Sequence, residues 1–226
     1  MNDFVSQFEQ HCVDAVKHWL ANGFYFSKNK ELGDKLLRDD TLTKGELMVC
    51  VSIFYDTIGR IPKAIKRSVK ECSGISCPTE LISGYAALKH ELESGADLLP
   101  RLSRKSKDLD YHDYMFDDWG IMHFHLGNSA DVTHPGLVQG TEKIAYVYLA
   151  PYEDIAYIID INSHGHWSDV ELLKKLDDDY PDALSPWCIK GVDDIGINAM
   201  GSDRAALRTS HVNACTKIND KVLISP

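Results

Sequence analysis

The sequence predicts an α+β fold, with an N-terminal helical part followed by a small antiparallel sheet with one or two packed helices. Apolar residues repeat at helical spacing up to residue 95, and the pattern changes to strand-like alternation from residue 119. The balance of charge also changes sharply near residue 107. These observations divide the chain into a helical domain (1–95), a linker (96–118) and an α+β domain (119–226).

The helical domain is predicted from its apolar spacing and its capping signals. Residues 3–22 carry five apolar side chains on one face, and Gly23 follows where a helix-ending glycine is expected. Thr43-Lys44-Gly45-Glu46 is a capping-box pattern that starts a second helix. Two further helices are predicted over Lys63–Cys72, which carries a basic face, and over Thr79–Glu93.

The α+β domain is predicted from apolar runs with strand composition, at 119–127, 143–149 and 156–161. In an extended first run, His123 and His125 share one face with Ile121, because alternate side chains of a strand point the same way. Ser168-Asp169-Val170-Glu171 is a second capping-box pattern. A short helix is predicted over residues 203–212 and a last strand over 221–224.

The bulk properties predict a cytoplasmic protein without a membrane partner. No apolar run approaches the roughly 20 residues that span a bilayer, and the N-terminus lacks the pattern of a secretion signal. The six cysteines are scattered without a Cys-x-x-Cys pair, which predicts buried, reduced thiols. Because the chain ends at Pro226, directly after a predicted strand, we also consider that a C-terminal segment is missing.

The net charge of −10 is concentrated in the middle of the chain. Residues 108–195 hold 18 acidic and only 4 basic residues, whereas the segments on either side are slightly basic. Phosphate contacts need Lys and Arg, so this distribution argues against nucleic acid lying along the middle segment. An acidic segment can instead bind cations or a basic protein partner.

The candidate catalytic residues are mostly histidines of the α+β domain. Two histidines that face a phosphodiester can act as base and acid near neutral pH, and a cation can stabilise the charge that develops on the phosphate. The sequence offers four histidines around the predicted strands and two further groups near the C-terminus for these roles: His123, His125, His164, His166, Arg204 and His211.

Three segments resemble the RelE/ParE-type toxins, which are small bacterial ribonucleases built on an antiparallel sheet. They are His123-Phe124-His125-Leu126-Gly127, Ile144 to Leu149, and Tyr157 to His164. The resemblance covers about a quarter of the chain and implies RNA cleavage, with His164 or His166 in the catalytic role at the end of the third strand. Those toxins usually carry several Arg and Lys residues on the sheet, where residues 108–195 hold four.

Three functions therefore stand as predictions. The leading one is a cytosolic, bacterial-type phosphodiesterase, a hydrolase of toxin or defence character that cleaves RNA without a metal or other cofactor. The second is a hydrolase that depends on a divalent transition metal such as Zn, with His123, His125, His164, His166 and Asp131 as ligands. The third is a non-enzymatic acidic protein, an immunity-type inhibitor or DNA mimic, that binds a basic protein partner.

Overall fold

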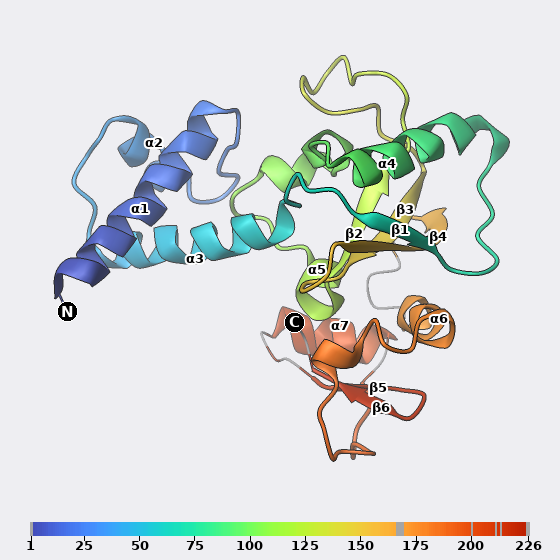
Figure 1. The fold of residues 1–226 in the computed structure, drawn as a ribbon. Helices are drawn as coiled ribbons and strands as arrows, with labels where there is room; N and C mark the ends of the chain where they lie inside the picture. Colours follow the sequence, from blue (N-terminus) through green and yellow to red (C-terminus); the bar gives the residue numbers. More distant parts are fainter. Residues whose placement is uncertain (1, 166–169, 200, 211, 213, 225–226) are drawn as a thin grey trace. The chain divides into compact units, whose positions relative to one another are not determined.

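The computed structural model describes residues 2–165, 170–199, 201–210, 212 and 214–224 (Figure 1). The chain forms two compact units, which we call the helical unit and the sheet unit. The helical unit comprises Met1–Pro62 and Arg104–His112, and the sheet unit comprises Lys63–Ser103 and Asp113–Pro226. The α+β class predicted from the sequence is confirmed, with the strands concentrated in the second unit.

The helical unit contains α1 (Asn2–Ala21), α2 (Lys30–Leu37) and α3 (Lys44–Arg60). The predicted capping box at the start of α3 is confirmed. The Thr43 hydroxyl accepts a hydrogen bond from the Glu46 N–H at 3.3 Å, and the Glu46 carboxylate accepts one from the Thr43 N–H at 2.7 Å. These two reciprocal bonds satisfy backbone groups that the first turn of a helix leaves without partners.

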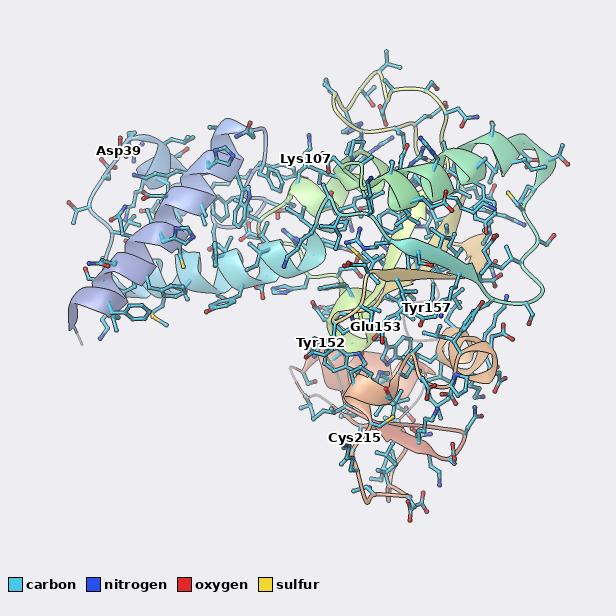
Figure 2. All side chains as sticks on the ribbon, in the orientation of Figure 1. Asp39, Lys107, Tyr152, Glu153, Tyr157 and Cys215 are labelled. Carbon is cyan, nitrogen blue, oxygen red and sulfur yellow. The ribbon has the colours of Figure 1, made fainter. Side chains whose placement is uncertain are left out.

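A second chain segment, which includes η3 (Arg104–Lys107), completes the helical unit. Tyr25 N–H donates to the carbonyl of Lys107 at 3.0 Å, and Leu109 N–H donates to the carbonyl of Tyr25 at 2.8 Å (Lys107 is labelled in Figure 2). The buried Arg60 guanidinium at the end of α3 donates to the carbonyls of Asp108 and Tyr111. The charge of Arg60 is thus solvated by the returning segment rather than by water.

The sheet unit is built on four strands in the order β1-β4-β3-β2. These are β1 (Ser68–Glu71), β2 (Ile121–His125), β3 (Lys143–Leu149) and β4 (Ile155–Ser163). The neighbours β2, β3 and β4 are antiparallel, as predicted, whereas β1 runs parallel to β4 and makes the sheet mixed. The helix predicted over Lys63–Cys72 is therefore wrong, because this segment supplies the edge strand β1.

One face of the sheet is covered by α4 (Ile82–Ser94), which is preceded by η1 (Thr79–Leu81). Leu88 and Leu92 of α4 pack in one apolar cluster with Met122 and Phe124 of β2. The predicted domain boundary at residue 95 therefore differs from the structure, since α4 belongs to the sheet unit. The predicted linker, 96–118, contains η2 (Leu99–Arg101), η3 and α5 (Tyr114–Trp119), and its residues are divided between the two units.

The other face of the sheet packs against the C-terminal part of the chain. Here lie α6 (Glu171–Asp179), η4 (Ser185–Trp187), α7 (Gly201–Thr209) and the hairpin β5 (Thr216–Ile218)–β6 (Lys221–Leu223). Tyr157 of β4 lies between the sheet and α6, with its ring centroid 5.0 Å from that of Tyr180 (Figure 2). The predicted helix start at Ser168 and Asp169 lies outside the described residues.

Three of the six free cysteines are fully buried, as expected for structural thiols. These are Cys12, Cys50 and Cys72, and burial raises the pKa of the Cys50 thiol to about 11. The other three cysteines are partly exposed. Among the described residues, no helix combines the length and the apolar character needed to cross a membrane.

Replacing Gly84 by alanine is expected to destabilise the protein by about 1–3 kcal/mol or more, in the range of overpacked cores. A Cβ at Gly84 would lie 1.7 Å from the carbonyl oxygen of Leu126, so α4 would have to move away from the end of β2. Gly45 in α3 is the matched control, because a Cβ there meets nothing closer than 4.0 Å. Urea denaturation should show Gly84→Ala weakened and Gly45→Ala unchanged or slightly stabilised.

Candidate active site

Three of the predicted histidines converge in the sheet unit. His123 and His125 project from the same face of β2, and His164 directly follows β4. The ring centroid of His164 lies 5.8 Å from that of His123 and 5.2 Å from that of His125. His164 is exposed and the other two are half-buried, so the group, here called the histidine cluster, is open to solvent at His164.

The register of the strands explains how His164 reaches β2 although β3 lies between β2 and β4. His125 of β2 pairs with Ile144, and the neighbouring Lys143 at the start of β3 pairs with Ser163 at the end of β4. The chain therefore leaves β4 beside the beginning of β3, next to His125. The Tyr146 hydroxyl donates to the carbonyl of Ser163 at 2.7 Å and fixes the point from which His164 extends.

The backbone of Thr141 sets the protonation pattern of two rings of the histidine cluster. Its N–H donates to Nδ1 of His125 at 2.9 Å, so Nδ1 must carry a lone pair and neutral His125 carries its proton on Nε2. Its carbonyl accepts from Nε2 of His164 at 3.3 Å, so neutral His164 carries its proton on Nε2 and its lone pair on Nδ1. His125 thus presents a fixed N–H donor, whereas His164 can present either a lone pair or, when protonated, an N–H.

This assignment predicts the tautomer of His125 in solution. Two-bond ¹H–¹⁵N correlation spectra of the neutral ring should show Nε2 of His125 protonated and Nδ1 unprotonated. A spectrum with the proton on Nδ1 of His125 would contradict the assignment.

His123 is backed by a carboxylate that the sequence analysis did not select. Oδ2 of Asp113 lies 3.6 Å from Nδ1 of His123, while Oδ1 of the same side chain accepts the N–H of Phe116 as the N-cap of α5. Burial lowers the pKa of His123 below its ordinary 6.5; Asp113 partly offsets this effect, and His164 adds to it. His123 is therefore neutral at pH 7, and the carboxylate favours the tautomer with its proton on Nδ1 and the lone pair on Nε2.

The other predicted site residues are engaged elsewhere or lie outside the described residues. Arg204 is buried and pairs through Nε with Asp118 at 3.0 Å, so the structure uses this cation in the core instead of at the histidine cluster. The buried Asp131 accepts hydrogen bonds from Thr133 and His134, which hold the pKa of its carboxyl well below the usual range. His166 and His211 are not among the described residues.

Within the described residues, no group of three or more His, Cys, Asp or Glu side chains is arranged to hold a metal ion. The tautomer of His125 gives one physical reason, because its Nδ1 lone pair already accepts the Thr141 N–H and its Nε2 carries a proton. Asp131, the proposed carboxylate ligand, is saturated by its own turn. In the described part of the histidine cluster, neutral His125 therefore has no lone pair left for a metal ion.

Sequence reasoning missed three residues that build the site: Asp113, Thr141 and Tyr146. Asp113 could have been recognised as a helix cap, since Gly120 follows seven residues later at a left-handed C-cap with φ of +65°. Its proximity to His123 could not be predicted, because it depends on the conformation of the turn that joins α5 to β2. Thr141 acts through its backbone, so no pattern of side chains could have identified it.

Comparison with known proteins adds no relative. No family model matches the chain, and neither a curated protein nor a solved structure matches it.

Proposed function

We propose that the protein is a metal-independent ribonuclease in which the histidine cluster supplies general acid–base catalysis. The proposal rests chiefly on one observation, the convergence of His123, His125 and His164 with different proton arrangements fixed by Asp113 and Thr141. The cytoplasmic location and the toxin or defence character expected from the sequence belong to the same proposal.

In this mechanism His123 is the base and His164 the acid. Nε2 of neutral His123 accepts the proton of a ribose 2′-hydroxyl, whose oxygen attacks the adjacent phosphorus. The new P–O2′ bond forms as the P–O5′ bond breaks, and protonated His164 donates its Nδ1 proton to the departing 5′-oxygen. The products are a 2′,3′-cyclic phosphate and a 5′-hydroxyl, and water can open the cyclic phosphate with the two roles reversed.

RNA suits this site because the substrate contains its own nucleophile. An internal 2′-hydroxyl needs a base and an acid but no metal-activated water, and DNA lacks this group. The fixed Nε2–H of His125 can donate to a non-bridging phosphate oxygen, where negative charge develops during the reaction. Each of the three rings then has a separate task.

The pH dependence of cleavage tests the assignment of the base. His123 must be neutral to accept a proton, and its pKa lies below 6.5. We therefore expect kcat/KM to be retained at pH 6.5 and to fall at lower pH as His123 becomes protonated. In Asp113→Asn the charge that raises the His123 pKa is lost, so the acidic limb should move to lower pH. A limb that does not move would argue against His123 as the base.

The decisive experiment is cleavage of end-labelled RNA by the purified protein with and without EDTA. We expect cleavage in both, ending in a 2′,3′-cyclic phosphate. His164→Ala, purified in the same way, is the control for contaminating ribonucleases, because its side chain is exposed and its loss should not unfold the protein. Cleavage that requires a metal would favour the metal-dependent alternative, and absence of cleavage would return attention to an acidic interaction protein.

A further inference from the structure

The basic side chains of the sheet unit are mostly committed to partners within the unit. Residues 113–226 contain 8 basic and 18 acidic residues. Six of the eight basic side chains form ion pairs, which are Lys174–Glu171, Lys175–Asp160, Arg204–Asp118, Arg208–Asp118, Lys217–Asp194 and Lys221–Asp177. Lys143 and Lys190 are exposed and make no ion pair with a described residue.

The earlier segment of the same unit, residues 63–103, contains six basic residues, and three of them are committed in a similar way. Of the other three, Lys63 and Lys66 are exposed, and Lys70 lies against the rings of Tyr157 and Tyr180. Arg101 pairs with Glu91 and donates to the carbonyls of His125 and Gly127. Its guanidinium is therefore buried next to the end of β2. Arg67 is also buried and donates to backbone carbonyls. Lys89 pairs with Glu71. With the six ion pairs of residues 113–226, nine of the fourteen basic side chains of the sheet unit are thus held by partners within it.

A long RNA chain would bind such a surface poorly. Polymer affinity comes largely from lysine and arginine side chains that neutralise successive phosphates and release counterions. Here the acidic excess of residues 113–226 repels phosphates that extend beyond the reacting one. A substrate with a single phosphodiester avoids most of this repulsion, and the three histidines suffice to contact its one phosphate.

We propose that the histidine cluster acts on short ribonucleotides, with a single phosphodiester between two nucleosides, rather than on long RNA. This inference rests on the proposed ribonuclease function and adds its substrate class. It follows from the ion pairs of the sheet unit together with the size of the histidine cluster. The ring centroid of His164 lies only 5.8 Å from that of His123 and 5.2 Å from that of His125.

The test compares a mixture of the sixteen ribodinucleoside monophosphates with a 30-nucleotide single-stranded RNA of mixed sequence, using wild-type protein. We expect kcat/KM per phosphodiester to be higher for the dinucleotides than for the 30-mer. The dependence of log kcat/KM for the 30-mer on log salt concentration should be shallower than about −1, since each neutralised phosphate contributes about −0.7.

A 30-mer cleaved at least about a hundredfold more efficiently than the dinucleotides, with a steep salt dependence, would overturn the inference and leave the ribonuclease proposal standing. Failure to cleave either substrate would overturn the ribonuclease proposal itself. Charge reversal at the exposed Glu142, next to Thr141, gives a second readout. Glu142→Lys should raise the ratio of 30-mer to dinucleotide cleavage several-fold relative to Glu80→Lys, and an unchanged ratio would count against the inference.

Discussion

Replacement of His123 by glutamine is expected to lower kcat for RNA cleavage by about 10²- to 10⁴-fold, the range that general acid–base groups contribute. Glutamine retains polar character at a half-buried position but cannot accept the 2′-hydroxyl proton at neutral pH. The substrate's other contacts remain, so KM should change much less than kcat. Initial rates over a range of substrate concentrations at pH 7 separate the two parameters.

His134→Gln is the matched control for this substitution. His134 lies in the loop between β2 and β3, where Nδ1 is 3.4 Å from the carboxylate of Asp131 and takes no part in the histidine cluster. Its replacement should leave kcat within about twofold of the wild-type value. Thermal melts of both variants would show that they are folded. If His123→Gln kept more than about a tenth of the activity while His164→Ala lost it, His123 would not be the base.

Replacement of Asp118 by alanine is expected to lower the free energy of unfolding by about 3–5 kcal/mol, as found when one partner of a buried ion pair is removed. Asp118 and Arg204 are each only 3% exposed, and Arg208 also pairs with Asp118 at 3.1 Å. Without the carboxylate, Arg204 would remain in the core with only the hydroxyl of Thr216 as a hydrogen-bond acceptor among the described residues. Its solvation by water would then require the C-terminal elements to loosen.

The neighbouring residue provides an internal comparison. Asp117 is 30% exposed and lies 3.8 Å from Arg208, so Asp117→Ala should cost less than about 1 kcal/mol. Urea denaturation of the two variants gives the difference directly. A loss below about 1 kcal/mol in Asp118→Ala would show that the buried pair contributes little. The folded fraction of Asp118→Ala should retain cleavage activity, which separates a structural role for Arg204 from a catalytic one.

The sequence predicted the elements whose signals are local. α1 and α3 follow from apolar spacing, and the cap of α3 follows from Thr43 and Glu46. β1 was missed because its hydrogen-bond partner is β4, which follows more than 80 residues later. The basic residues around Ser68–Glu71 matched a helix equally well. The assignment of residues 63–95 to the helical domain failed for the same reason, since α4 joins the sheet unit through distant strands.

The candidate site was predictable in part. Alternation along Ile121–His125 placed two histidines on one face, and that part is confirmed. Whether His164 joins them depends on the register of β3 against β4, which a single sequence does not specify. A shift of two residues in the pairing of Lys143 with Ser163 would move His164 by about 7 Å along the strands. The contribution of Asp113 depended in the same way on the turn that joins α5 to β2.

The interleaving of the two units affects the order in which the chain can fold during synthesis. The first 62 residues leave the ribosome early, but Arg60 obtains its acceptors only when Asp108 and Tyr111 have followed. By then β1 and α4 have also emerged. The strand β4, which pairs with β1, and the strand β2, which packs against α4, have not. The nascent chain must therefore hold two incomplete cores at the same time, and the first can close well before β4 closes the second.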